Sequence, residues 1–304
     1  LPAARANAKA AGFSGAMYPW QSAQKGDEQS QFTHLNPITQ AWDPDNSRLQ
    51  RHVSLDIAYD VWTYYHTTLD REFLAKYGME LLLSIAEFWI SKATYDETTD
   101  RYSIAGVMGP DEFHENYPNH QTPGLKNNAY TNIMVAWLFD TIAQLRDQLD
   151  NGAYQKAAAA ANFNTDLANK MAAISHKLTL EINHSGIIAQ FEGYFNLPTL
   201  DFQAYRQKFG DISRMDRILK AEGKTPDAYQ VAKQADALMA FYNFDVPTVQ
   251  KLIKQLGYSL PKEYLTHNIQ YYLERTTHGS TLSRIVYAVL KLLDETYGLG
   301  WGVF

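Results

Sequence analysis

The stretch from Asn128 to Gln148, NAYTNIMVAWLFDTIAQLRDQ, decides how the rest of the sequence is interpreted. Its apolar residues, among them Ile133, Trp137 and Leu138, recur at the spacing of a helix. Asn128 stands in front of them, where a short polar side chain caps the first turn. The stretch therefore predicts a long helix that begins at an Asn cap.

Most other segments between polar breaks follow the same pattern, so that roughly nine helices are expected in all. Only Arg101–Val107 and Gly186–Phe191 have the character of strands. The other expected helices are Leu1–Ala11, Val53–Leu69, Asp70–Ala93, Ala153–Leu180 with a break near Asn162–Asn164, Tyr229–Phe244, Val246–Leu256, Pro261–Leu273 and Thr281–Tyr297. No Pro- or Gly-rich linker divides the chain, so we predict an all-α protein with one domain, residues 1–304.

The composition excludes several classes of protein. The 304 residues include 27 Lys and Arg against 33 Asp and Glu, and this net charge of −6 argues against a nucleic-acid partner. The absence of Cys rules out a disulfide scaffold and a thiolate metal site. No His-x-x-x-His pair or Asp/Asn calcium loop suggests a metal. No apolar run reaches the roughly 18 residues of a membrane span, so we expect no membrane partner and a cytoplasmic protein.

Three long segments between helices hold the residues that suggest chemistry: Gly12–Arg51, Ala105–Asn127 and Glu192–Thr225. Loops of this length without their own secondary structure are usually functional. An all-α domain with long loops on one face is typical of a toroid built from helical hairpins. The 20 Tyr, 14 Phe and 6 Trp fit such a protein, since aromatic rings also form sugar-binding platforms.

The sequence GPDEFHEN, residues 109–116, is the sharpest of these signals. Gly109 and Pro110 favour a tight turn that presents the next side chains into a cavity. Asp111 and Glu112 beside an aromatic residue suit a carboxylic acid of raised pKa with a supporting neighbour. An acidic surface loop is the other interpretation of the same residues.

Two further segments fit sugar binding. In FSGAMYPWQS, residues 13–22, a rigid turn carries Tyr18 and Trp20, which either stack on a pyranose or pack in the core. In KQAD, residues 233–236, Lys233 and Gln234 fall off the apolar stripe of the expected helix, so they either bind a ligand or form a solvated face.

The sequence TTHGSTLSR, residues 276–284, opens the last long helix. Four hydroxyl groups precede or begin this helix together with His278 and the flexible Gly279. Backbone N–H groups at a helix N-terminus favour an anion. The segment therefore predicts either an oxyanion site or a Ser/Thr cap with spare hydroxyls.

Taken together, these segments resemble the catalytic domain of glycoside hydrolase family 65, which contains maltose, trehalose, kojibiose and nigerose phosphorylases and some hydrolases. The matching motifs occur in the family's order over nearly the whole chain: GAMYPWQSA at 15–23, DIAY at 56–59, GPDEFH at 109–114, NNAYTN at 127–132, KQAD at 233–236 and HGSTLS at 278–283. The resemblance implies an (α/α)6 barrel. It also implies cleavage of an α-glucosidic bond with inversion and no metal or organic cofactor.

The resemblance also implies a role for single residues. Glu112 corresponds to the general acid, and Trp20, Lys233 and Gln234 correspond to residues that hold the glucosyl unit in the −1 subsite. The phosphate-binding segment of the family's phosphorylases corresponds to His278, Ser280 and Thr281. These matches make a disaccharide and inorganic phosphate the expected substrates.

The chain lacks some features of the family. The early Trp-Asp motif, the first barrel helices and the large N-terminal β-sandwich are absent from the sequence, so we expect the later part of the barrel, roughly nine of its twelve helices. Its expected partners are then a second copy of the chain or the missing domains of the same protein.

Three functions remain as alternatives. A phosphorylase needs no catalytic base because phosphate is already an anion. An inverting hydrolase must activate water with a carboxylate, for which Glu274 is the candidate. A non-catalytic carbohydrate-binding scaffold is the third alternative. The segment TTHGSTLSR, residues 276–284, favours phosphorolysis, with release of β-glucose 1-phosphate.

Overall fold

The computed structural model describes residues 1–110, 113–277, 279 and 281–298, and the side chains of the last helix up to Asp294. Helices dominate these ranges, so the predicted all-α class is confirmed. They are α1 (Pro2–Ala10), α2 (Val53–Thr68), α3 (Arg71–Phe73), α4 (Met79–Lys92), α5 (Ala129–Arg146), α6 (Asn151–Ala160), α7 (Thr165–Lys177), α8 (Phe202–Phe209), α9 (Met215–Ala221), α10 (Asp236–Asn243), α11 (Val246–Gln255), α12 (Tyr264–Leu273) and α13 (Thr281–Gly298).

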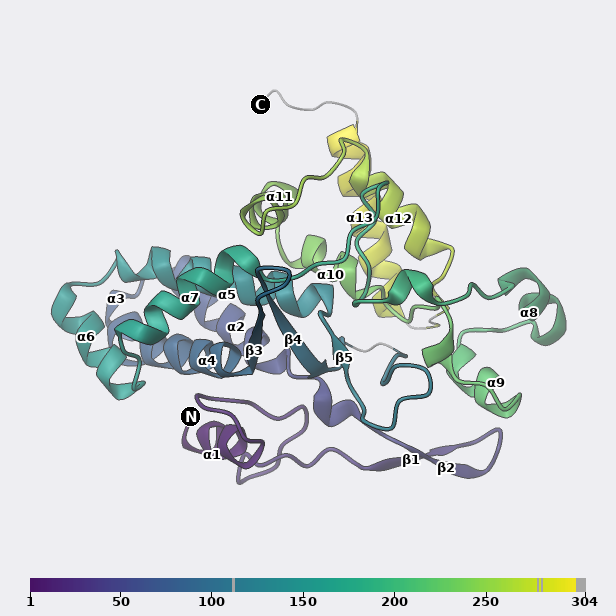
Figure 1. Ribbon diagram of the computed structural model, residues 1–304, viewed down its shortest axis with the longest axis horizontal. Coiled ribbons are helices and arrows are strands. Elements are labelled where there is room, and N and C mark those ends of the chain that lie inside the picture. The colour runs from purple at the N-terminus through teal and green to yellow at the C-terminus, as the bar shows by residue number, and fades with distance from the viewer. Residues whose placement is uncertain (111–112, 278, 280, 299–304) are drawn as a thin grey trace.

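Helix α5 lies at the centre of the helical core. It contacts α2, α4, α7, α10 and α11. The Asn128 side chain caps it as predicted, since its carbonyl oxygen accepts a hydrogen bond of 3.0 Å from the Thr131 N–H group. Apolar residues occupy most faces of this helix, so neighbours must cover it from several sides. Figure 1 shows α2, α4 and α7 around it on one side and the group α10–α13 above it.

Two small antiparallel sheets lie between the helices. Strands β1 (Thr33–Asn36) and β2 (Ala41–Pro44) form a hairpin, and β3 (Ala93–Asp96), β4 (Arg101–Val107) and β5 (Leu125–Lys126) form a second sheet. Strand β4 has the predicted bounds. The strand predicted at Gly186–Phe191 is wrong, because this segment forms only an isolated bridge between Ile182 and Ile188.

Among the predicted helices, Asp70–Ala93 is formed by α3, a π-helical turn at Leu74–Gly78 and α4, and two others differ strongly from their predicted bounds. Ala153–Leu180 is divided into α6 and α7, and the break falls at the predicted place, where Asn162 has a φ of 56°. The helix predicted over Tyr229–Phe244 begins only at Asp236. Its first residues are extended instead, because Gln230 and Ala232 pair with Thr199 and Thr276 in parallel bridges.

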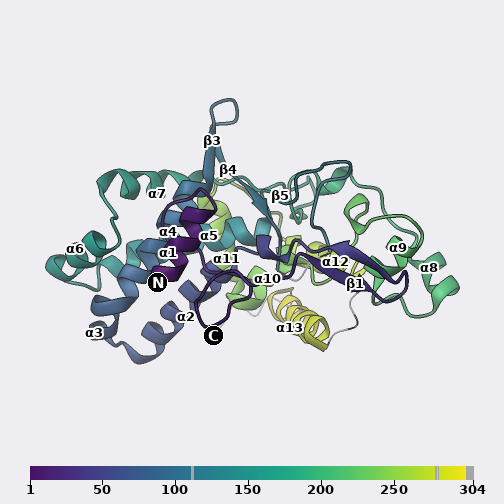
Figure 2. The ribbon, with the colours of Figure 1, turned by 90° about the horizontal axis from the view of Figure 1, so that it is seen from below.

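All three long loops contain short elements that were not predicted from the sequence, and the one within Ala105–Asn127 is β5. The hairpin β1–β2 lies within Gly12–Arg51, and α8 and α9 lie within Glu192–Thr225. Eight and seven residues are too few for a helical period to stand out. Figure 2 shows this hairpin and these two helices at the end of the molecule opposite α3 and α6.

Helix α9 has its own small apolar cluster, which we call the satellite core: Phe113, Ile212, Met215, Ile218, Leu219 and Val231. It is separate from the main core around α5. An ion pair of 3.4 Å between Lys220 and Asp43 joins α9 to β2. None of the helices in the described part of the chain combines the length and the apolar character that a membrane crossing requires.

Candidate active site

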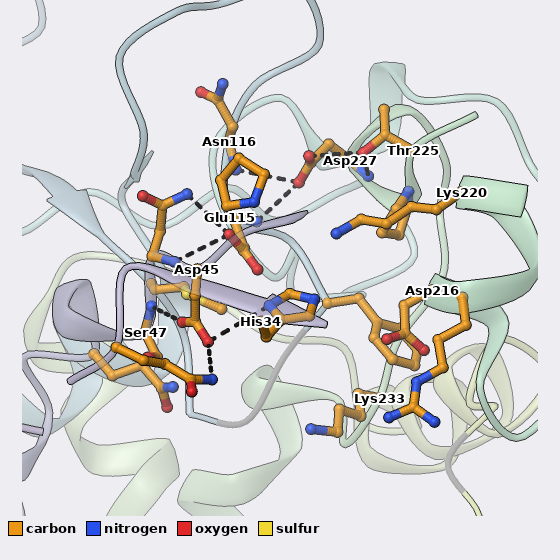
Figure 3. A pocket seen from close by; sticks show the side chains of 18 of the residues that line it. His34, Asp45, Ser47, Glu115, Asn116, Asp216, Lys220, Thr225, Asp227 and Lys233 are labelled. Carbon is orange, nitrogen blue, oxygen red and sulfur yellow. Dashed lines mark hydrogen bonds and ion pairs between the residues drawn. The ribbon is translucent and has the colours of Figure 1, made fainter. Parts of the chain in front are cut away.

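A cavity of about 580 Å³ lies beside the satellite core, whose Phe113 is one of its lining residues (Figure 3). Four segments line it: the first loop with its hairpin, the segment between β4 and β5, helix α9 with the residues after it, and the stretch before α10. Trp20, Phe113, Arg217 and Lys233 each represent one of these segments. The cavity therefore brings together residues more than two hundred positions apart in the sequence.

The first loop is held tightly against α4, and this positions Trp20. Gly15 has a φ of 76°, and a Cβ atom built on it would lie only 2.3 Å from the Phe88 backbone nitrogen. Only glycine fits such a backbone conformation and so close an approach. The Glu28 carboxylate then accepts hydrogen bonds from the backbone N–H of Trp20, at 3.2 Å, and of Gln21, at 3.3 Å. The turn predicted for this segment is therefore present.

The Trp20 ring packs against a buried histidine. The ring centroids of Trp20 and His52 are 5.7 Å apart, and His52 also contacts Tyr130. Burial lowers the pKa of His52 to about 4, so the imidazole is neutral at physiological pH. A neutral aromatic surface of this kind supports the Trp20 side chain without adding a charge below it.

The segment that contains Gly109 approaches the start of α10 without space for a side chain. A Cβ atom on Gly109 would lie 1.5 Å from Oδ2 of Asp236. That same oxygen accepts a hydrogen bond of 2.9 Å from the Asn128 side-chain amide. Asp111 and Glu112, the predicted general acid, lie outside the described residues. Met108 and Phe113, on either side of them, both line the cavity.

Lys233 and Gln234 were expected in the first turns of a helix, but α10 begins only after them, at Asp236. They form a bend before α10, and Ala235 then adopts a left-handed φ of 65°. A non-glycine residue in this conformation carries strain, which concentrates at functional sites. Lys233 lines the cavity, whereas Gln234 is buried beside it and is not among the lining residues.

The segment before α13 lies alongside Lys233. The Ala232 N–H donates to the Arg275 carbonyl at 2.9 Å, and the Thr277 N–H donates to the Ala232 carbonyl at 3.0 Å. The Ser283 hydroxyl donates to the Lys233 carbonyl at 3.4 Å. His278 and Ser280 lie outside the described residues, and Thr281 is the exposed first residue of α13. The backbone thus joins the predicted phosphate segment to the predicted sugar-binding segment.

Glu274 is separated from this arrangement. Its side chain is 75% exposed and forms an ion pair of 3.4 Å with the neighbouring Arg275. It follows the last residue of α12, and it does not line the cavity. Its carboxylate is therefore not part of the described cavity.

The cavity wall also contains a network of carboxylates that was not predicted from the sequence. Asp227 accepts hydrogen bonds from the backbone N–H groups of Glu115, at 2.8 Å, and of Asn116, at 3.1 Å. Glu115 in turn accepts a hydrogen bond of 2.9 Å from the Asn46 side chain, and burial raises its pKa. These residues come from loops with no periodicity, so no sequence signal related them to one another.

The basic residues at the N-cap of α9 and within it were not predicted either. Arg214, Arg217 and Lys220 all line the cavity, together with Asp216. They belong to the charged sequence RMDRILK, residues 214–220, which lies within Glu192–Thr225, a segment predicted to be a loop. Among the residues that the structure describes, no group of three or more His, Asp or Glu side chains could hold a metal ion.

Comparisons with known proteins place this arrangement in a family. The sequence profile of the glycosyl hydrolase family 65 central catalytic domain matches residues 1–297. A trehalose 6-phosphate phosphorylase of Lactococcus lactis is 48% identical over 95% of this chain and 36% of its own length. A kojibiose phosphorylase of Halothermothrix orenii is 31% identical over 98% of this chain and 36% of its own length.

A solved structure supports the fold. It is titled a putative kojibiose phosphorylase from the human microbiome, and it matches with a TM-score of 0.70 at 24% identity. The match covers 98% of this chain and 38% of that one, and it agrees with the expected (α/α)6-type barrel part. The chain spans about a third of the length of these relatives. As the profile and the relatives show, the chain belongs to glycosyl hydrolase family 65 and carries residues of its central catalytic domain.

Proposed function

We propose that the protein cleaves the α-glucosidic bond of a disaccharide with inorganic phosphate, inverting the anomeric centre and releasing β-glucose 1-phosphate. The observation that carries the proposal is the convergence of Trp20, the two flanks of residues 109–112 and Lys233 around one cavity. In the sequence these residues belong to three separate family motifs. Their meeting in space is what a common substrate site requires.

In this mechanism Glu112 gives its proton to the glycosidic oxygen as the bond to the anomeric carbon breaks. A phosphate oxygen attacks that carbon from the opposite face, as inversion requires. The proton that the new sugar phosphate releases restores the acid. Trp20, Lys233 and Gln234 hold the glucosyl unit, and no metal or organic cofactor is needed.

Phosphate is favoured over water as the nucleophile for two reasons. Thr277 and Ser283 contact the chain at Ala232 and Lys233, and the sequence between them contains His278, Ser280 and Thr281, whose donors suit an anion. The candidate base for hydrolysis, Glu274, is exposed and outside the cavity lining. A phosphate oxygen requires no such base.

The relatives leave the disaccharide open. One is named for trehalose 6-phosphate and others for kojibiose, and all are about three times as long as this chain. We therefore infer a phosphorylase of α-linked glucosyl disaccharides as the function of the site. The choice among disaccharides depends on the wall of the cavity beyond the glucosyl subsite.

The test is to follow products from a panel of α-linked glucosyl disaccharides, with and without inorganic phosphate. We expect β-glucose 1-phosphate to form only when phosphate is present. The Glu274→Gln variant separates the two nucleophiles, because only a hydrolase would depend on that carboxylate. Free glucose as the sole monosaccharide product, formed without phosphate and lost in Glu274→Gln, would show hydrolysis instead.

A further inference from the structure

The chain on both sides of the proposed general acid is held in place. On the N-terminal side, Gly109 lies so close to Asp236 that no side chain would fit between them. On the C-terminal side, residues 113–116 are the next described residues, and only residues 110–112 lie between the two sides. Three residues of chain have a short reach, so whatever holds residues 113–116 also limits where Glu112 lies.

The Asp227 carboxylate is one anchor of residues 113–116. Its Oδ1 atom accepts hydrogen bonds from two successive backbone N–H groups, those of Glu115 at 2.8 Å and of Asn116 at 3.1 Å (Figure 3). A charged acceptor makes such bonds stronger than those between neutral groups. Two neighbouring N–H groups on one oxygen fix both the position and the direction of the backbone at this point.

The Asp227 side chain is itself fixed. Its second oxygen, Oδ2, accepts a hydrogen bond of 2.8 Å from the Thr225 hydroxyl. Asp227 belongs to the short 3₁₀ helix η4 (Pro226–Ala228), and its N–H donates back to the Thr225 hydroxyl oxygen at 3.3 Å. The ring of Pro226 restricts φ in this turn. Both carboxylate oxygens are therefore in use, and the group has little freedom to rotate.

A histidine adds a second anchor to the same stretch. The His114 ring is buried, and its Nε2 atom lies 2.9 Å from the Tyr229 carbonyl oxygen. Because a carbonyl oxygen can only accept a hydrogen bond, Nε2 carries the proton. Residues 225–229 thus hold three successive residues, 114–116, which begin two positions after Glu112.

We propose that Asp227 is a positioning residue for the general acid, and that its carboxylate sets the place from which Glu112 gives its proton to the glycosidic oxygen. Asp227, Glu115 and Asn116 all line the cavity, so the two N–H groups can turn to water when the carboxylate is removed. The domain then stays folded while the acid moves. A misplacement of about 1 Å can cost about 100-fold in rate. This inference rests on the proposed function, because it needs Glu112 as the acid of that cleavage.

Two substrates separate the position of the acid from other effects. The leaving oxygen of a disaccharide needs a proton, whereas α-glucosyl fluoride releases fluoride as an anion when its carbon–fluorine bond breaks. With inorganic phosphate as nucleophile, both substrates yield β-glucose 1-phosphate. In the 304-residue chain, we expect Asp227→Ala to lower kcat by about 100-fold for the disaccharide of the panel that is cleaved fastest. The KM for that disaccharide and the kcat for the fluoride should stay close to the wild type.

Four variants give this result its meaning. Glu112→Gln should show the same selective loss. Asp227→Asn keeps an acceptor oxygen for both N–H groups and should stay within about tenfold of the wild type. Asp227→Glu keeps the charge but displaces it by one methylene, so it should lose disaccharide cleavage selectively even where Asp227→Ala unfolds. Asp201→Ala removes the cap of α8, which accepts from the Ala204 N–H at 2.9 Å outside the cavity lining, and neither rate should change.

Thermal unfolding of each variant shows whether it is folded. Equal losses for the disaccharide and the fluoride in folded Asp227→Ala or Asp227→Glu would mean a general structural role and would overturn the inference. An undiminished rate for the disaccharide in these variants would overturn it as well.

The proposed function fails in a different way. If the wild type forms no β-glucose 1-phosphate from either substrate, phosphorolysis itself is contradicted. Amide hydrogen exchange then decides on the anchor. The Glu115 and Asn116 amides should be protected in the wild type and in Asp227→Asn, and they should exchange faster in Asp227→Ala. Unchanged exchange would show that Asp227 does not hold this stretch.

Discussion

The main core around α5 and the satellite core beneath α9 are built in different ways. In the main core a long helix is covered by several neighbours, and large side chains such as Trp89, Phe139 and Leu138 are almost completely buried. The satellite core has only a few apolar residues under a seven-residue helix. Apolar burial is the main source of folding free energy, so the main core stabilises the domain while the satellite core mainly positions the wall of the cavity.

The sharpest way to separate activity from stability is the variant Glu112→Gln. It keeps the size of the side chain but removes the proton that the proposed mechanism transfers. General acid catalysis typically contributes about 10²- to 10⁴-fold, so we expect a loss of that size in kcat. The midpoint of thermal unfolding should not change. A folded variant with nearly normal turnover would show that another residue is the acid.

A matched pair of leucines compares the two cores directly. Leu138 in α5 and Leu219 in α9 are both fully buried. Leu138→Ala should lower the free energy of unfolding by about 2–5 kcal/mol, and the folded fraction should keep its kcat/KM. Leu219→Ala should lower kcat/KM because α9 shifts, with a smaller effect on global unfolding, since local regions open independently. Urea titrations measure the free energy of unfolding, and initial rates measure kcat/KM. Equal effects of the two variants on both quantities would contradict the separate roles of the two cores.

His52 links the main core to the cavity and makes its stability depend on pH. Its pKa is about 4 in the folded chain and about 6.5 when unfolded, so the unfolded state binds more protons between these values. This contribution to stability is complete above pH 6.5 and falls as the pH drops toward 4. At pH 4.5 the loss from this group is about 2–3 kcal/mol. Urea unfolding of His52→Gln at pH 7 and pH 4.5 should show a smaller difference than the wild type.

The smallest effect is expected at a helix cap far from the cavity. The Asp150 side chain accepts a hydrogen bond of 2.9 Å from the Ala153 N–H at the start of α6. Asp150→Ala should lower the free energy of unfolding by about 1 kcal/mol, the usual contribution of such a cap. Because α6 contacts α4 and not the cavity wall, kcat/KM should stay the same. A change in activity would mean that the main core and the cavity are more tightly coupled than proposed.

Much of the helical architecture could be predicted because its signals are local. Asn128 as a cap, the break near Asn162 and the bounds of β4 all follow from short-range rules. The same holds for the motifs, since Trp20 and Lys233 were identified from residue types at fixed spacing and do line one cavity. Their assigned roles, like those of Glu112 and His278, remain predictions.

Other features depend on contacts between distant segments and have no local signal. Residues 229–235 are not helical, because Ala232 pairs with Thr276 across more than forty positions. The wall formed by Asp227, Glu115 and α9 exists only because separate loops meet there.

Helix periodicity and caps arise within a few residues of chain, so the amino-acid order alone specified most of the long helices and the motifs. The positions of the charged side chains around the cavity were specified only when distant segments packed together. The reason is physical: a hydrogen bond along a helix joins neighbours in the sequence, whereas burial and charge pairing act through space. Gly109 shows the difference most clearly. A Cβ atom at this position would collide with Asp236, which is more than a hundred residues away in the sequence.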